Sequence, residues 1–150
     1  MTVYSQLKDK IKTKLQAITQ IQEVHDEPTY QFEGYPAVTF YPIESDDSKS
    51  ANTTQDDVYY NFQIDIFHNV PEESNGIGEA IDTLYNTVDY ILDPFRKDAY
   101  YSGLTLPSGY TFLKLEPISA GWEQDTERKL LIATIKLKHL IRSTATNNCI

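Results

Sequence analysis

The sequence predicts an α+β fold, an α/β sandwich with two main helices packed on one face of a mostly antiparallel or mixed sheet of about four to five strands. Three observations predict it: apolar residues recur at helical spacing near the N-terminus and again at 77–92, whereas residues 58–66 alternate between apolar and polar. The 150 residues are 40% hydrophobic and 12% aromatic, enough to fill one core. We therefore expect a single domain over residues 1–142 and a flexible C-terminal tail over residues 143–150.

The N-terminal segment predicts an amphipathic helix over about residues 2–20. Its apolar residues fall on one stripe while the interleaved lysines face solvent: Val3, Leu7, Ile11, Leu15 and Ile18. The segment "IQEVHDEP" predicts a short extended piece closed by Pro28. A turn is expected at "QFEGYP", because Gly34 is free in φ and Pro36 restrains the residue before it.

Two strands are predicted on either side of a long polar stretch. The run "AVTFYPI" is rich in β-branched and aromatic residues, and Pro42 restricts it to a strand terminus, a bulge or an edge. The clearest strand follows the stretch, with one apolar face and one wetter face. The apolar face holds Val58, Tyr60, Phe62, Ile64 and Ile66, and the other holds Tyr59, Asn61, Gln63 and Asp65.

A second helix and two further strands complete the predicted order. The helix covers residues 77–92, with Ser74 or Asn75 as its N-cap, and Asp93-Pro94 is expected to end it. "TFLKLEPI" and "ERKLLIATIKLKHLI" predict the strands, the second central at its start and exposed on one face later. Helix is the alternative for that second segment, and its β-branched residues favour strand.

The charge and the cysteine count exclude several classes. A net charge of -9 argues against a protein that grips phosphate backbones. The N-terminal lysines interrupt any apolar run, so we expect neither a secretory signal nor a membrane span, and a mature chain that starts near Met1 in a cytoplasm. The single Cys149 excludes an internal disulfide.

Motifs for chemistry are missing from the sequence. His25, His68 and His139 have no metal-binding spacing, and Cys149 lies too close to the C-terminus to be held against a general base. "NGIGEA" lacks the third glycine of a dinucleotide-binding loop. We therefore expect no enzyme, no cofactor and no metal.

The polar stretch 45–57 is expected to be a long loop between two central strands. Acidic pairs at both of its ends could collect a hard cation such as Ca²⁺ or Mg²⁺: Asp46 with Asp47, and Asp56 with Asp57. The stretch lacks the alternation and the closing glutamate of an EF-hand, which favours a solvated charged loop.

Aromatic residues allow two interpretations. Trp122, in "SAGWEQDTERK", is expected where a turn or bulge joins the last two strands, either as a partly buried anchor or as a contact with a partner. Among the 11 tyrosines, some are expected at strand faces or loops. They would form an interface or cover the second sheet face within one subunit: Tyr41, Tyr59, Tyr100 and Tyr101.

This order of elements resembles the tail terminator (tail completion) proteins of long-tailed bacteriophages. The resemblance spans about residues 3–142 and rests on element order and texture. It comprises an amphipathic helix ending in "IQEVHDE", the strand "YPAVTFYPIESDD" entering a polar loop, and the strand "TTQDDVYYNFQIDIF" leaving it. The helix "GEAIDTLYNTVDYIL" and the hairpin "GWEQDTERKLLIATIKLKHLI" follow.

The resemblance implies a structural virion protein of the tail neck, assembled in the host cytoplasm, that catalyses nothing. Its copies would form a hexameric ring on the last ring of the tail tube, end tube polymerisation and provide a docking face for the head–tail connector or stopper protein. Genomic DNA would pass the lumen without specific binding, because carboxylates facing the lumen repel phosphates.

The polar loop and the final hairpin are then the expected contacts with neighbouring subunits or the tube. Loop residues would become ordered on assembly, and Arg128 would pair with a carboxylate across a subunit boundary. The expected contact residues are Asp46, Asp47, Lys49, Asn52, Asp56, Asp57, Trp122, Glu123, Asp125 and Arg128. The alternatives are another neck protein (a head–tail stopper or minor tail protein), or a small non-catalytic ligand- or peptide-binding regulatory domain.

Overall fold

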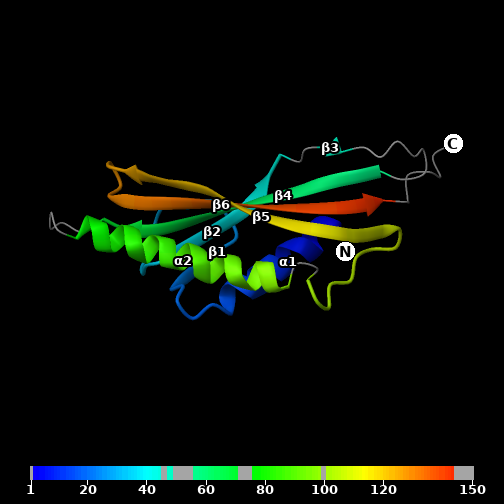
Figure 1. Cartoon of the computed structure of the whole chain (residues 1–150), viewed down its shortest axis with the longest axis horizontal. Coiled ribbons are helices and arrows are strands. Elements are labelled where there is room, and N and C mark those ends of the chain that lie inside the picture. Colours follow the sequence, from blue (N-terminus) through cyan, green and yellow to red (C-terminus); the bar gives the residue numbers. More distant parts are fainter. Residues whose placement is uncertain (1, 45–46, 49–55, 71–75, 99–100, 144–150) are drawn as a thin grey trace.

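The computed structural model describes residues 2–44, 47–48, 56–70, 76–98 and 101–143. Figure 1 shows the strands running along the long axis of the molecule, with both helices on the same side of them. The predicted fold class, two helices on one face of a mixed sheet, is confirmed. Within the described residues the order is α1 (Val3–Gln16), β1 (Glu23–His25), β2 (Ala37–Ile43), β3 (Asp47–Ser48), β4 (Asp56–Asn69), α2 (Ile77–Lys97), β5 (Tyr110–Asp125) and β6 (Leu130–Ser143).

The sheet has the strand order β1-β2-β4-β6-β5, and the short β3 pairs with β4. β1 pairs in parallel with β2, and every other pairing is antiparallel. β4 and β6 form the centre and pair without interruption, from Asp56 opposite Ser143 to Asn69 opposite Leu130. β2 and β4 are neighbours, so the polar stretch joins two interior strands, and Asp47–Ser48 of that stretch enters the sheet.

The core lies between the sheet and the two helices. Alternate residues of β4 point toward the helices, and the predicted apolar face of this strand is buried at Phe62, Ile64 and Ile66. Both helices add their apolar stripes to the same cluster, so the predicted amphipathic patterns are confirmed. The helix residues in it are Val3, Leu7, Ile11 and Leu15 of α1, and Ala80, Leu84, Val88, Ile91, Leu92 and Phe95 of α2.

Helix α1 begins as predicted but ends four residues early, at Gln16. Thr2 and Ser5 form a capping box, in which each side-chain oxygen accepts the backbone N–H of the other at 3.1 Å. Ile18 is still buried, although it follows the helix. Its N–H donates to the Leu15 carbonyl in a turn, so the chain bends while it keeps this side chain in the core.

Helix α2 does not end at Asp93-Pro94, as the sequence predicts, but continues through Pro94 to Lys97. Proline removes the hydrogen bond to the carbonyl four residues earlier, which belongs to Tyr90 on the exposed side of the helix, where water can replace it. The next residue, Phe95, is fully buried, and this burial offsets the cost of the proline. The N-cap is Gly76, without a side-chain cap, and the predicted caps at 74–75 lie outside the described residues.

The last two strands form a long hairpin, which settles the helix alternative for the C-terminal segment in favour of strand. β6 pairs with β4 and β5 over its whole length, so neither of its ends is exposed as an edge. β5 begins as predicted but extends to Asp125, and its pairing is irregular between Ser119 and Trp122. Trp122 therefore lies at a bulge inside β5, and not at the turn that joins the last two strands. Ser143, the first residue of the predicted tail, belongs instead to β6. The rest of that tail, residues 144–150, lies outside the described ranges.

A buried polar pair lies on the core side of β6. The hydroxyl of Tyr101 is 2.6 Å from Nε2 of His139, and Nδ1 of His139 is 2.8 Å from the Tyr60 carbonyl oxygen. A carbonyl only accepts, so Nδ1–H donates to it and neutral Nε2 accepts from Tyr101. Tyr101, expected at an interface or over the second sheet face, is instead a core residue, 1% exposed. Tyr100 lies outside the described residues.

Burial lowers the pKa of His139 from 6.5 to about 4. The unfolded chain therefore takes up a proton near pH 6.5 that the folded chain resists until about pH 4, so stability falls as the pH drops through this interval. We expect this group to lower the free energy of unfolding by about 2 kcal/mol between pH 7 and pH 5. Urea unfolding at the two pH values measures it.

The matched variant is His139→Gln, which keeps one donor and one acceptor but does not titrate. It is expected to be less stable at pH 7 and to lose much less stability on going to pH 5. Equal losses in the variant and in the wild type would show that His139 is not the titrating group.

Candidate assembly interface

The sheet face opposite the helices, called here the helix-free face, is covered only at one end by described residues. There the segment 29–36 folds over the sheet, and Phe32 and Tyr35 pack on Ala37, Phe67 and Ile132. This contact buries the apolar end of the face. The remainder of the face carries polar and charged side chains of β2, β4, β5 and β6.

The covering segment is held by a carboxylate and a cation. Glu23 accepts the backbone N–H groups of Glu33 and Gly34, at 2.5 and 2.7 Å, and the hydrogen bond from Gly34 lowers the pKa of Glu23. The Arg128 guanidinium carbon lies 4.2 Å from the centroid of the Tyr30 ring, so the β5–β6 turn contacts the same segment.

A hydrogen-bonded cluster centred on Asp65 follows along β4. Its carboxylate accepts from the Tyr41 hydroxyl at 2.6 Å, from Nε2 of Gln63 at 2.9 Å and from the Thr134 hydroxyl at 3.2 Å. Burial, and then the hydrogen bond to Asp65, raise the pKa of Tyr41 above its usual range. The cluster joins β2, β4 and β6 across the face.

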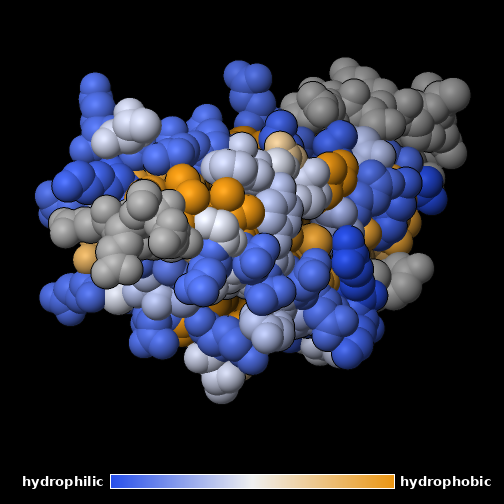
Figure 2. Space-filling view, turned by 60° about the vertical axis from the view of Figure 1, so that its left-hand side comes forward, coloured by the Kyte–Doolittle hydropathy of each residue, from blue (hydrophilic) through white to orange (hydrophobic). Residues whose placement is uncertain are grey.

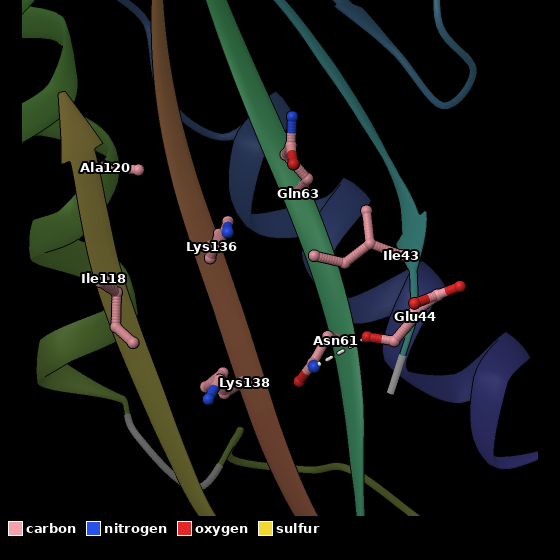
Figure 3. Close-up of a pocket in the computed structure, with 8 residues that line it drawn as sticks. All are labelled: Ile43, Glu44, Asn61, Gln63, Ile118, Ala120, Lys136 and Lys138. Carbon is pink, nitrogen blue, oxygen red and sulfur yellow. Dashed lines mark hydrogen bonds between the residues drawn. The ribbon is translucent and has the colours of Figure 1, made fainter. Parts of the chain in front are cut away.

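A shallow groove of about 610 Å³ lies next to this cluster, in the middle of the helix-free face. Figure 3 looks onto it and shows two lysines of β6 between side chains of β4 and β5. Asn61, at the bottom of the groove, donates from Nδ2 to the carbonyl of Glu44, at its side, at 3.0 Å. The floor is Asn61, Gln63, Lys136 and Lys138, and the borders are Ile43 of β2 with Glu44 just after it, and Ile118 and Ala120 of β5.

Most charges near the groove are already engaged. Lys114 pairs with Glu116 at 2.6 Å, and the Lys138 ammonium lies 5.3 Å from the centroid of the Tyr59 ring. Lys136, in contrast, is exposed and has neither a hydrogen bond nor an ion pair with any residue that the structure describes. The groove floor thus carries two lysine charges, of which Lys136 is unpaired among the described residues, and the Glu44 carboxylate stands at its border.

The expected contact residues of the polar loop are only partly visible. Asp46, Lys49 and Asn52 lie outside the described residues, and the backbones of Asp47 and Asp56 lie in β3 and β4. Asp57 is paired within its own chain, with 2.8 Å from Nε of Arg142 to Oδ1 and 3.1 Å from its Nη2 to Oδ2. Arg142 lowers the pKa of the Asp57 carboxyl.

The expected residues of the hairpin divide in a similar way. Trp122 and Glu123 are exposed on the edge strand β5. Arg128 pairs with Asp125 of the same chain, with 2.8 Å between Nη1 and Oδ2. Asp125 would therefore compete with any carboxylate of a neighbouring subunit for Arg128.

The structure separates the two groups of expected residues along the sheet. Asp57 is opposite Arg142 at one end of the β4–β6 pair, and Asp125 is opposite Leu130 at the other. β6 spans about 43 Å between these ends, at about 3.3 Å per residue. The groove lies between the groups, and the sequence reasoning missed it. The alternation of Lys136 and Lys138 with apolar residues in "IKLKHL" was the signal for their common face.

Other site types were sought among the described residues. No group of three or more histidine, cysteine or acidic side chains there could hold a metal ion. The same ranges contain no helix that is long and apolar enough to cross a membrane.

Comparisons with known proteins were made for the sequence and for the fold. No protein-family model and no curated protein matches the chain. Among solved structures, a chain of the "Virion of native gene transfer agent (GTA) particle" has a similar fold, with a TM-score of 0.58 and 11% sequence identity. The match covers 94% of this chain and 98% of that one. The two chains therefore share their fold from end to end.

The Asp65 cluster gives a testable prediction about this face. Asp65→Ala leaves the Tyr41 hydroxyl, the Gln63 amide and the Thr134 hydroxyl without their common acceptor in a half-buried site. We expect the free energy of unfolding to fall by about 1–3 kcal/mol. Glu123→Ala, at an exposed position, is the control and should change it by less than about 0.5 kcal/mol in the same urea titration. Equal effects of the two variants would contradict a stabilising role of the cluster.

Proposed function

We propose that this protein is a structural component of a phage-type virion and forms a hexameric ring at the head-proximal end of the tail tube. The observation that carries the proposal is the shared fold with a chain of a gene transfer agent virion, over 94% of this chain and 98% of that one. The ring ends tube polymerisation and offers its outer face to the head–tail connector. Its partners are its own copies, the tail tube protein and the connector.

Two surfaces support an assembling role. β5 is an edge strand, and its side chains Ile118 and Trp122 are 42% and 40% exposed. Half-exposed aromatic and apolar residues are typical of protein–protein interfaces. Apart from the end under residues 29–36, no described segment covers the helix-free face. In Figure 2, apolar patches lie between hydrophilic residues on the side in view.

The charge and the chemistry of the surface fit the same role. A net charge of -9 favours free passage of DNA through the lumen of a ring, because carboxylates repel phosphates. The groove on the helix-free face is lined by lysine, glutamate, amide and apolar side chains. We propose a non-catalytic place in the virion, which the fold shared with a virion chain supports.

The mass of the protein in solution tests the ring. We expect a light-scattering mass of about 103 kDa, six times the 17.2 kDa of one chain, that falls on dilution. The second measurement is binding to the open head-proximal end of purified tail tubes, followed by electron microscopy. A protein that stays monomeric and binds no tube end contradicts the proposed function. A protein that binds only the head connector would be a stopper.

Trp122→Ala tests whether the β5 edge takes part in assembly. Since Trp122 is half-exposed, the substitution should leave the fold and the thermal midpoint nearly unchanged while it weakens association about tenfold, a typical effect of removing an interface aromatic. Gln20→Ala, exposed on the other layer, is the control. Unchanged association of the Trp122 variant would exclude this side chain from the interface.

A further inference from the structure

The outer face of α2 is acidic and aromatic. Asp82, Asp89 and Asp93 point directly away from the buried stripe of this helix, and the half-exposed Tyr85 and Tyr90 flank them on either side. Asp93 pairs with Lys97 at 2.8 Å. Asp82 and Asp89 have no ion pair with any residue in the described ranges. Unpaired carboxylates between two exposed tyrosines are a composition suited to a contact with a cationic surface.

The strands that border the groove on the helix-free face are far enough apart to seat one helix between them. Its borders are β2 and β5, and β4 and β6 lie between them, so about 14 Å separates the border strands at about 4.8 Å per strand. An α-helix with its side chains is about 10–12 Å across. Lys136 and Lys138 stand on the floor, Ile43 and Ile118 are the apolar borders, and Glu44 lies at the border next to Ile43.

We propose that α2 of one copy lies in the groove of the next, with Asp82 and Asp89 against Lys136 and Lys138. This inference rests on the proposed function and names the contact that closes the ring. The helices of the same chain already cover one face of the sheet, so the neighbour's helix gives the second face an equivalent cover. Lysines of α1, which could compete for the carboxylates, are engaged in their own chain: Lys8 and Lys12 with Asp26, Lys14 with Asp98, and Lys10 with the Ser102 carbonyl.

The geometry of this contact also allows a closed assembly. α2 lies on one side of the sheet (Figure 1), and the groove residues face the other side, so each copy uses one surface to bind the copy before it and the other to bind the copy after it. Such head-to-tail contacts generate a ring when the rotation between copies closes.

Charge reversal tests the contact with two double variants. The groove variant is Lys136→Glu with Lys138→Glu, and the helix variant is Asp82→Lys with Asp89→Lys. When copies of one variant meet each other, the groove and the helix carry charges of the same sign and repel. Each variant alone should therefore associate at least tenfold more weakly than the wild type in a light-scattering concentration series. The control, Asp9→Lys with Glu27→Lys, makes the same charge change as the helix variant at exposed positions elsewhere and should associate like the wild type.

Mixing the two variants is the decisive arm. In an equimolar mixture every groove can meet a helix of opposite charge if the variants alternate around an even-numbered ring. We expect the mixture to recover the mass of the wild type, and circular dichroism to be the same for all chains. Failure of the mixture to recover, with both variants folded, would overturn the proposed contact.

Carbodiimide coupling of the wild type gives an independent readout, because it joins a lysine directly to a carboxylate. Mass spectrometry should find Lys136 or Lys138 linked to Asp82 or Asp89 between copies. A hexameric mass that persists in both charge variants overturns this contact and leaves the ring intact. A monomeric wild type overturns the contact, and binding to tube ends then decides the proposed function separately. Binding of duplex DNA by the wild type and its loss in the groove variant, at unchanged mass, would assign the lysines to nucleic acid instead.

Discussion

The pairing of β4 with β6 is the constraint on which the rest of the structure depends. The two strands exchange hydrogen bonds from Asp56 opposite Ser143 to Asn69 opposite Leu130, so their alternation is locked over the full length of the sheet. Phe62 and Leu137 face the helices together, and Gln63 and Lys136 face away together. A slip of one residue would exchange the two faces. The core and the groove are therefore two consequences of one register.

The helices are placed by that core and by polar ties at its rim. Nζ of Lys14 lies 2.7 Å from Oδ2 of Asp98, and this lysine together with the Ser102 backbone lowers the pKa of Asp98 to about 2. The end of α2 is thereby attached to α1, which holds α2 with its buried stripe on the sheet and its carboxylates outward. The helix keeps this position through Pro94 because Phe95 is buried beyond it.

The helix-free face is covered at one end, carries an ion pair at the other and is open in the middle. Aromatic side chains of residues 29–36 cover one end, and the ion pair of Asp57 with Arg142 occupies the other. Between them the strands present a helix-wide polar groove with apolar borders. A rigid sheet that leaves one helix-sized surface open, and a helix that presents complementary charge on the opposite side, is an arrangement suited to repeated assembly of one chain.

The sequence by itself determined the elements, their order and the faces of each, because hydrophobic periodicity is a local property of helices and strands. The stripe of α1, the alternation of β4 and the two-helix, mixed-sheet fold class were all predictable in this way. Local patterns also predicted an irregularity near Trp122, although it lies inside β5 and not at the turn to β6.

Only the tertiary structure decided which strands pair, where α2 ends and which polar residues find partners in their own chain. Pro94 is a helix stop by local preference, and burial of Phe95 overrides it. The sequence pattern predicts a surface position for Tyr101. In the structure this residue lies in the core, where His139, 38 residues away, accepts its hydrogen bond. The groove belongs to four strands that are distant in the sequence, and its width follows from their order in the sheet. Such features arise from non-local packing, which the periodicity of a single segment does not encode.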